Sequence, residues 1–417
     1  MPGKDSKLAF QGQHTGVVFK ERWFFPKGQG PFVLYETQVL PILVLVLSMK
    51  EKKDMKKIGL VNYDMSVRGG AQQVLCNMAN ALCADYEITV ISLTQENGAC
   101  AYELPEGVHY EVMLPRKARI REVLTQARES FCQCIEKHKL DLVFLLGVYA
   151  GGCGSLLGRK QKVPFVFCDH GALLNQWKQL PVRLMRMVGL KFTQKTVVLT
   201  KQSEEAYYQK FHCKKNRVIT IYNWMDDRVK EAAAPYDTSS LSILTAGRFS
   251  QEKGLDLLLD TAAALKKKKD DFVWDVYGDG ELMDEVRQRI KEEGLEKNVI
   301  LKGLTNHMEE CYQNHAMYVL TSYREGLPLV LIEAKANALP LVSFDVISGP
   351  REIISHGEDG ILIPPYDTEK MAEEIYELLE KPEKRLRLSE NSQNNLDLFS
   401  KETILSQWKA LIQEFVG

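Results

Sequence analysis

The sequence predicts an α/β protein with two Rossmann-like, doubly wound parallel sheets. Its 417 residues are enough for two domains of ordinary size. From Lys57 onward, short apolar runs alternate with longer amphipathic stretches, which is typical of parallel strands joined by crossover helices. The alternation is interrupted at 230–240, where small and polar residues predict a linker, and a second series begins at Leu241. We therefore expect one sheet on each side of this linker.

The first half of the chain predicts six strands and an initial crossover helix. The helix is expected over 71–84, after a turn at 66–70, because its apolar side chains fall on one stripe. The strands are short and apolar and are expected at 58–62, 88–92, 141–146, 164–167, 195–199 and 218–222.

The second half repeats this pattern, although not the sequence, and ends in a helix. A closing helix is expected over 401–415, where Trp408 and Leu411 supply an apolar side. The strands of this half are expected at 241–244 and near Phe272, Val299, Met317, Pro340 and Gly360.

Composition narrows the class of protein. A net charge of −1 argues against a nucleic-acid partner, because such proteins carry a basic surface. The nine cysteines are an odd number and include no Cys-x-x-Cys pair, so we expect neither a zinc site nor a disulfide framework. Reduced thiols are typical of a cytoplasmic protein.

The first 55 residues do not continue the α/β pattern. Their apolar run, 39–47, is too short to span a bilayer. A signal peptide is not expected either, because the run lacks a short basic start and a small-residue cleavage site. We expect residues 1–55 to be a leader or disordered extension, with Met49 or Met55 as the natural start. A weakly membrane-contacting segment is the alternative.

Two glutamates flank a predicted helix start. Glu325 precedes Gly-Leu-Pro, which reads as a turn, and Pro328 suits the first position of the helix that contains Glu333. The N–H groups of Leu329 and Val330 would then be exposed at the positive end of the helix dipole, where a phosphate binds well. Carboxylates beside a phosphate are favourable when a polyhydroxylated group donates hydrogen bonds to them. The segment therefore predicts a nucleotide-sugar pocket, or alternatively a solvated pair of carboxylates beside an amphipathic helix.

A second segment carries two cations on a strand-to-helix turn. Arg248 and Lys253 follow the strand at 241–244, and the next helix is expected to start near Gly254. A guanidinium fork and an ammonium point charge together suit a diphosphate. The alternative for Arg248 is a surface ion pair with Glu252 or Glu281.

These segments, with the Gly-rich turn at 276–282 and the segment 348–352, closely resemble the retaining family 4 glycosyltransferases, also called group 1 glycosyltransferases. The mark of that family is the glutamate-x7-glutamate element, here Glu325 to Glu333. The resemblance runs from about Lys57 to the C-terminus. It implies the GT-B architecture, in which two Rossmann-like domains face each other across a cleft. The implied parts are an acceptor domain over 56–228, a nucleotide-sugar domain over 241–396 and a closing helix, 397–417, that returns to the first domain.

The resemblance also assigns roles to residues of the second domain. Arg248 and Lys253 would stabilise the leaving diphosphate, together with the amides at the start of the Pro328 helix. Glu333 would accept hydrogen bonds from the ribose, and Glu325 would bind hydroxyls of the transferred sugar. The remaining donor-binding residues in this implied set are Gly326, Leu329 and Val330.

In the first domain, the resemblance points to a histidine and a glycine pair. His170 follows a strand at a position near the family's reacting centre, although a lone histidine at a strand end is often structural. Gly69 and Gly70 match a glycine pair that lets the backbone approach the donor phosphates or the acceptor. Gln72 and Trp224 depart from the family pattern, which expects glutamate and glycine there.

The implied reaction is retaining. The acceptor would attack from the face that the diphosphate leaves, and the diphosphate would take its proton. We expect no metal and no other cofactor, because cations and a helix dipole neutralise the charge and the sequence contains no Asp-x-Asp triplet. The expected donor is a UDP-linked hexose or N-acetylhexosamine, and the expected acceptor is a bacterial surface polysaccharide or lipid-linked glycan.

Two Rossmann-like halves are also compatible with other functions. A nicotinamide dehydrogenase should carry Gly-x-Gly-x-x-Gly after its first strand, whereas this chain has only Gly69 and Gly70 there. A nucleotide-sugar epimerase or a non-catalytic sugar-nucleotide-binding protein remains an alternative.

Two basic stretches are candidates for contact with the acceptor or with a membrane. Residues 176–191 alternate cations with apolar residues, and 116–121 are shorter and more densely charged. Such segments suit an anionic membrane surface or a lipid-diphosphate acceptor. The alternative is a solvated helix face with its apolar side in the core. We expect a cytoplasmic protein, with peripheral contact at the inner face of the plasma membrane as the further option.

Overall fold

The computed structural model describes residues 55–417, apart from 234 and 306. The predictions for the extension 1–55 therefore fall almost entirely outside the described residues. Residues 55–417 form one compact unit that contains two sheets. No helix in the described part is long and apolar enough to cross a membrane.

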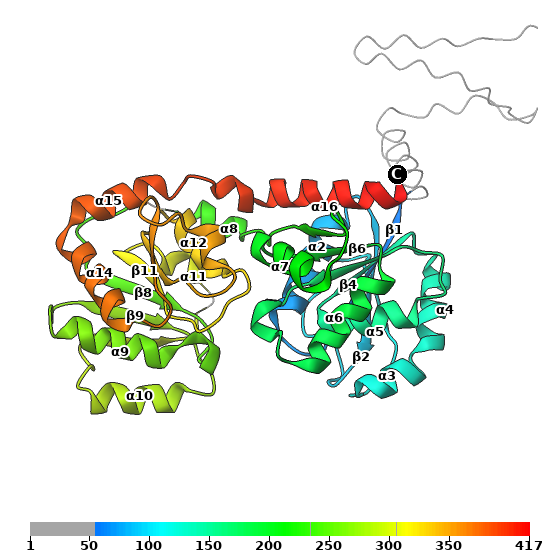
Figure 1. Cartoon of the computed structure of the whole chain (residues 1–417), viewed down its shortest axis with the longest axis horizontal. Helices are drawn as coiled ribbons and strands as arrows, with labels where there is room; N and C mark the ends of the chain where they lie inside the picture. The colour runs from blue at the N-terminus through cyan, green and yellow to red at the C-terminus, as the bar shows by residue number, and fades with distance from the viewer. Residues whose placement is uncertain (1–54, 234, 306) are drawn as a thin grey trace, which may run out of the picture. The chain divides into compact units, whose positions relative to one another are not determined.

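The first sheet has seven parallel strands in the order β3-β2-β1-β4-β5-β6-β7. Figure 1 labels β1, β2, β4 and β6 of this sheet. The order reverses direction beside β1, as in doubly wound folds. Its central strands are buried on both faces, which explains their continuous apolar runs. The strands are β1 Lys57–Asp64, β2 Glu87–Thr94, β3 His109–Val112, β4 Leu142–Leu146, β5 Phe165–Asp169, β6 Lys195–Val198 and β7 Val218–Thr220.

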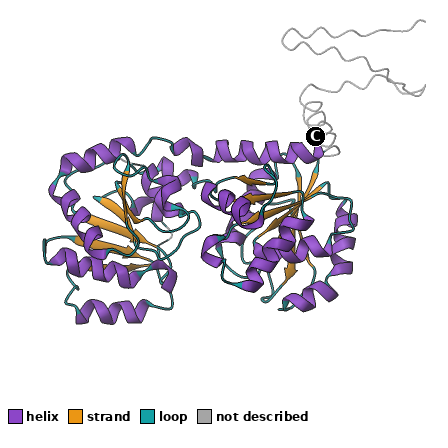
Figure 2. Ribbon diagram, viewed as in Figure 1, coloured by secondary structure: helices purple, strands orange, loops and turns teal. Residues whose placement is uncertain are grey.

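The second sheet has six parallel strands in the order β10-β9-β8-β11-β12-β13. Each sheet lies among the helices that connect its strands (Figure 2). The prediction of two doubly wound parallel sheets is confirmed. The strands are β8 Ser242–Ala246, β9 Val273–Tyr277, β10 Val299–Gly303, β11 Met317–Leu320, β12 Leu341–Phe344 and β13 Gly360–Ile363.

The helices connect successive strands and then close the fold. The helices that accompany the first sheet are α2 Gly70–Leu82, α3 Ile120–Gln126, α4 Arg128–His138, α5 Val148–Leu157, η1 Leu174–Gln176, α6 Leu180–Phe192 and α7 Lys201–Phe211. Those that follow are α8 Asp227–Glu231, η2 Gln251–Lys253, α9 Leu255–Lys266, α10 Met283–Glu292, α11 Met308–Cys311, α12 Leu329–Ala336, α13 Pro350–Ile353, α14 Thr368–Glu380, α15 Pro382–Asn391, η3 Leu396–Phe399 and α16 Lys401–Val416.

Every strand expected from the sequence is present, and one strand was missed. β3 is an edge strand with no buried residue, so it has no apolar run to reveal it. Two boundaries also differ from expectation. Pro328 is the N-cap of α12 rather than its first residue, and α8 extends to Glu231, inside the expected linker.

Helix α5 forms although three of its residues are glycines, which disfavour a helix. The glycines are required by close packing instead. An added Cβ would lie 2.2 Å from Phe167 at Gly151 and 2.5 Å from the Met185 sulfur at Gly152. Tertiary packing against β5 and α6 therefore overrides local propensity.

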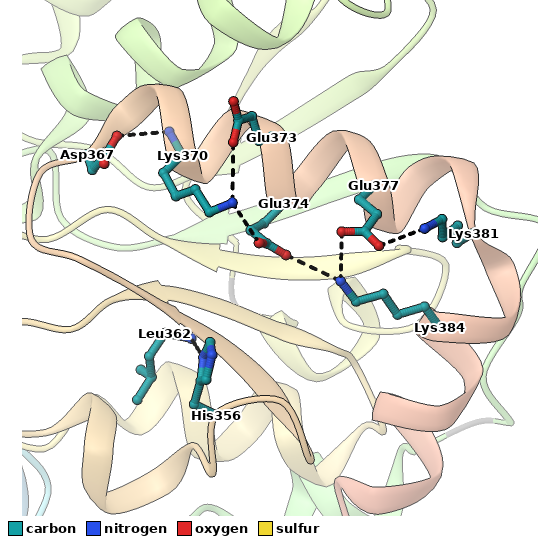
Figure 3. Close-up of polar contacts among 9 residues, drawn as sticks. All are labelled: His356, Leu362, Asp367, Lys370, Glu373, Glu374, Glu377, Lys381 and Lys384. Atoms are coloured by element: carbon teal, nitrogen blue, oxygen red, sulfur yellow. Dashed lines mark hydrogen bonds and ion pairs between the residues drawn. The ribbon is translucent and has the colours of Figure 1, made fainter.

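A network of lysine and glutamate side chains lies on α14 and α15 (Figure 3). Glu377 pairs with Lys381 at 2.8 Å and with Lys384 at 3.1 Å, and these hydrogen bonds lower the pKa of Glu377 to about 2. Lys384 also contacts Glu374. Because the pairs are largely exposed, each adds little to stability.

The last helix, α16, packs on the first sheet. Its Trp408 meets Phe144 of β4 edge to face, with ring centroids 5.5 Å apart, and is 3% exposed. Leu411 and Ile412 join the same core as Ile58 of β1. The C-terminal residues thus complete the core beside the N-terminal strand.

We expect Trp408→Ala to lower the free energy of unfolding by about 3–5 kcal/mol, because it removes a large buried side chain from the core. Urea denaturation measures the change. Gln413→Ala, an exposed position on the same helix, is the control and should stay within about 0.5 kcal/mol of wild type. Equal stability of the two variants would contradict the packing described.

Candidate active site

The predicted site residues lie just after the carboxyl ends of parallel strands. Gly69 and Gly70 follow β1, His170 follows β5, Arg248 follows β8 and Glu325 follows β11. In doubly wound sheets this edge is where ligands bind.

A cavity of about 540 Å³ is lined by residues of both halves of the chain. Gly70 and His170 contribute from the first half, and Gly326 and Leu329 contribute from the second. Gly326 lies close to the first half, because an added Cβ would be 3.7 Å from the carbonyl oxygen of His170. The structure therefore brings four of the predicted site residues to one cavity.

Glu325 is held by a lysine and a serine. Lys253 Nζ donates to Glu325 Oε1 at 2.8 Å, and Ser322 Oγ donates to the same oxygen at 2.7 Å. The Glu325 side chain is only 8% exposed, so its charge is offset mainly by Lys253. Both are predicted site residues, and they meet across 72 positions of sequence.

The turn after β8 delivers Lys253 to this position. Lys253 ends η2, and Gly254 adopts a left-handed conformation, φ 63°. An added Cβ at Gly254 would lie 2.2 Å from the carbonyl oxygen of Thr321, so only glycine allows this close approach. The turn thereby presses against the end of β11, directly before the Glu325 loop.

Arg248 is exposed and lies at a second cavity of about 480 Å³. Its guanidinium is 3.3 Å from Glu281, which is the surface ion pair considered as the alternative. The same cavity is lined by Gly278 and Gly280 of the Gly-rich turn. An added Cβ at Gly278 would lie 1.8 Å from the carbonyl oxygen of Gly247, so this turn also requires glycine. Arg248 and Lys253 both border a small cleft beside Ser322.

The start of α12 is packed by the loop after β12. Pro328 caps the helix, so the amides of Leu329 and Val330 lie in its first turn, where backbone donors have no partner within the helix. Gly349, φ 99°, contacts this turn, and an added Cβ would lie 2.6 Å from Pro328 Cδ and 2.7 Å from the Gly326 oxygen. The loop that contains Gly349 therefore holds the positive end of the helix in place.

Glu333 lies within α12 and is largely buried. Tyr312 Oη donates a 2.7 Å hydrogen bond to its Oε2. Burial raises the pKa of Glu333, and the bond from Tyr312 partly opposes this. Neither of the two larger cavities described above is lined by Glu333, so it does not join His170 and Gly326 at a common wall.

His170 lines the cavity, and its ring has no hydrogen-bond partner among the described residues. Both ring nitrogens are shielded from solvent, and neither makes a hydrogen bond within the described residues. Burial lowers the pKa of His170 to about 4, so the ring is neutral near pH 7. A neutral imidazole with free hydrogen-bonding capacity at a cavity wall can bind a hydroxyl group.

Comparison with known proteins agrees with this geometry. Residues 68–229 match the family described as Glycosyltransferase Family 4, and residues 227–395 match Glycosyl transferases group 1. The chain belongs to the group 1, or family 4, glycosyltransferases. The predicted GT-B architecture is thereby confirmed.

Two curated relatives match this glycosyltransferase over most of their length. An uncharacterized glycosyltransferase of Haemophilus influenzae is 26% identical over 359 residues, which cover 86% of this chain and 100% of the relative. A Campylobacter jejuni enzyme is 24% identical over 355 residues, covering 83% of this chain and 95% of the relative. Its name is GalNAc-alpha-(1->4)-GalNAc-alpha-(1->3)-diNAcBac-PP-undecaprenol alpha-1,4-N-acetyl-D-galactosaminyltransferase.

The fold is shared with solved structures. Anabaena HepE, solved in complex with UDP and glucose, aligns with a TM-score of 0.72 at 20% identity. The alignment covers 86% of this glycosyltransferase and 99% of HepE.

A buried network behind His170 was missed by sequence reasoning. Arg186 of α6 is fully buried and donates to the carboxylate of Asp169 at 2.6 Å. Tyr207 donates to the same carboxylate at 2.7 Å, and the carboxylate also accepts the Gly171 N–H at 3.0 Å. These bonds fix the backbone on both sides of His170 in the glycosyltransferase.

Arg186 was expected to belong to a basic surface stretch, 176–191, and the structure corrects this. A signal was available, because Arg186 shares the helical spacing of the buried residues Val182 and Gly189. Tyr312 and Ser322, which hold the two glutamates, carried no comparable signal. Tyr312 lies 21 positions before Glu333, and Ser322 is a polar residue in a predicted loop.

The raised pKa of Glu333 predicts a cost in stability. Between the ordinary value of 4.5 and the raised value, the folded glycosyltransferase retains a proton that the unfolded chain has lost. Stability contributed by this group therefore falls as pH rises through that window. Glu333→Gln cannot ionise, so we expect it to unfold at higher urea concentration than wild type at pH 7.5, and by a smaller margin at pH 5.

Tyr312→Phe is the matched control, because it removes the hydrogen bond that stabilises the Glu333 carboxylate. This variant should lose stability relative to wild type, and more at pH 7.5 than at pH 5. A pH-independent difference in both variants would show that Glu333 is not strained by burial.

Proposed function

We propose that this protein is a retaining glycosyltransferase that transfers a hexose or N-acetylhexosamine from a UDP-sugar. The proposed acceptor is a growing bacterial surface polysaccharide or lipid-linked glycan. The observation that carries the proposal is the Lys253–Glu325 pair, which joins the predicted diphosphate cation to the predicted sugar carboxylate at 2.8 Å.

The comparisons support the finer points of donor and acceptor. The Campylobacter relative is named for transfer to a glycan on diphospho-undecaprenol, and HepE was solved with UDP and glucose. We propose that 241–396 bind the nucleotide sugar, 56–228 bind the acceptor and 397–417 return to the acceptor domain. A cavity lined from both halves suits a reaction between the two ligands.

The donor would lie between the Gly-rich turns and the start of α12. Lys253, Arg248 and the amides of Leu329 and Val330 would bind the diphosphate, where negative charge increases as the sugar departs. Positive charge from these groups would be preorganised, because Lys253 and the α12 turn are both held by neighbouring loops. Glu333 would accept hydrogen bonds from the ribose hydroxyls, either in place of the hydrogen bond from Tyr312 or in addition to it.

The reacting carbon would lie beside Glu325 and His170. The bond from the anomeric carbon to the diphosphate oxygen breaks, and the acceptor oxygen bonds to that carbon on the same face. The acceptor proton passes to the departing diphosphate, so atoms and charge balance. Glu325 would stabilise positive charge on the sugar ring, and neutral His170 would bind a sugar hydroxyl.

A panel of sugar nucleotides tests the function directly. We expect slow hydrolysis of one UDP-linked hexose or N-acetylhexosamine by the full chain, and transfer with retained configuration, as seen by NMR. Hydrolysis of no member of the panel, or an inverted product, would contradict the proposal.

Lys253→Ala should weaken UDP binding by about 1.5–3 kcal/mol, because it removes a charge-assisted hydrogen bond to the diphosphate. Titration calorimetry measures the affinity. Lys269→Ala is the control, since Lys269 is also a shielded, ion-paired lysine but pairs with Asp271 and Glu380 instead. Unchanged UDP affinity in Lys253→Ala would remove Lys253 from the site.

The two glutamates should differ in kinetic effect. Glu325→Gln removes charge near the reacting carbon, so we expect kcat to fall by about 10²–10³-fold with little change in UDP affinity. Glu333→Gln removes binding made equally in ground and transition states, so it should raise the donor KM by about tenfold or more.

Exposed Glu296→Gln is the control for both variants and should keep wild-type kinetics. If Glu325→Gln and Glu333→Gln also kept wild-type kinetics with the true donor, the roles given to this helix start would be wrong.

Transfer is expected to continue in excess EDTA. Lys253, Arg248 and the first turn of α12 would supply the positive charge that a divalent ion supplies in other transferases. Initial rates with EDTA, magnesium or manganese are the measurement. Loss of activity in EDTA that magnesium or manganese restores would show that the reaction depends on a metal.

A further inference from the structure

Helix α6 exposes a row of large apolar side chains. Leu180 is 52% exposed, Leu184 is 45% exposed and Met187 is 48% exposed. Their spacing of four and three residues places them on one face of the helix (α6 in Figure 1). Single exposed apolar residues are common on protein surfaces, whereas a contiguous row marks an interaction site.

The surroundings of this row are basic. The 34 residues from His170 to Ser203 contain six cations and no carboxylate. Three of these cations are paired: Arg186 with Asp169, Lys195 with Glu414 and Lys201 with Glu204. The other three, which flank the apolar row, form no salt bridge within the described residues. They are Lys178, Arg183 and Lys191.

An aromatic side chain lies at the start of the same segment. Trp177 is covered by the Arg183 guanidinium at 5.1 Å and by Lys210 at 5.6 Å from its ring. Tryptophan beside cations is typical of segments at the boundary between lipid headgroups and water.

The other basic stretch, 116–121, lacks these features. Arg116 pairs with Glu122 at 2.8 Å, and Lys117 pairs with Glu96. Its charge is thus partly balanced within the chain, and its apolar residues Ala118 and Ile120 are not among the exposed large side chains. The solvated alternative therefore fits 116–121 better than it fits α6.

The opposite face of the α6 segment belongs to the candidate active site. Gln176, Gln179 and Val182 line the 540 Å³ cavity that also contains His170. Arg186, on the inner face, is bonded to Asp169 next to His170. One helix therefore separates the apolar row from the cavity, and its position is fixed by a buried ion pair.

We propose that the outer face of α6 docks on an anionic lipid surface. Leu180, Leu184 and Met187 enter the headgroup boundary, and Lys178, Arg183 and Lys191 contact anionic headgroups. Docking at this helix places the cavity beside the membrane, within reach of a lipid-linked acceptor. This last step rests on the proposed function, whereas the docking itself does not.

Vesicle sedimentation of the full chain, without donor or acceptor, tests the docking. We expect binding to vesicles of phosphatidylcholine with phosphatidylglycerol, weaker binding to phosphatidylcholine alone, and release by salt. Leu184→Glu/Met187→Glu should reduce the binding constant by at least about tenfold, because two apolar contacts are replaced by repelled charges. Lys178→Gln/Arg183→Gln/Lys191→Gln should lose the preference for the anionic vesicles.

Leu386→Glu/Leu398→Glu is the matched control, because these side chains are 40% and 46% exposed on other elements. It should bind vesicles as wild type does. The proposal would be overturned if the wild-type protein did not bind anionic vesicles. It would also be overturned if Leu184→Glu/Met187→Glu bound them as well as wild type does.

A second copy of this chain is the other occupant that the test can reveal. Sedimentation equilibrium showing a wild-type dimer, a monomeric Leu184→Glu/Met187→Glu variant and no vesicle binding by either would replace the lipid with a dimer interface. Failure of the proposed function looks different: vesicle binding would persist while no sugar nucleotide was used.

Discussion

Parallel pairing of the strands is the constraint on which the site depends. Parallel strands of one sheet have their carboxyl ends at a single edge, so loops that leave nearby strands at this edge lie close together. The loops after β1 and β5 bring Gly70 and His170 together, and those after β8 and β11 bring Lys253 to Glu325. Residues far apart in sequence thus become neighbours without any local signal between them.

Three carboxyl groups near the site are each held by a different set of partners. Glu325 receives an ammonium group and a hydroxyl, Asp169 receives a buried guanidinium and a phenol, and Glu333 receives a phenol alone. Removal of one partner from a buried charge is far more costly than the pair is stabilising. The charge of Asp169 has the most hydrogen-bond donors around it, and Asp169 holds the backbone beside His170. The charge of Glu333 has the fewest, and we propose that a bound ligand supplies further donors.

The sequence was most informative where structure is local. Buried parallel strands are continuous apolar runs, so they could be located to within a few residues, and the charged loops at their ends could be placed at the ligand edge. β3 was invisible because none of its four residues is buried, so it shows no apolar run. Arg186 was misplaced because a charged residue reads as surface, and its partner Asp169 lies 17 positions away. Tyr312 and Glu333 meet only after α11 and α12 have packed, which no pattern in the sequence describes.

The return of α16 to the first sheet joins segments that are far apart in the sequence. Ile58 and Trp408 share a core, although 350 positions separate them. During synthesis, the strands of the first sheet are made long before α16, so apolar surface on β1 and β4 has no cover until α16 emerges. The exposed intermediate is open to aggregation or chaperone binding throughout that interval. A chain truncated before Leu411 would therefore lose part of the core beside the first sheet, not beside the second.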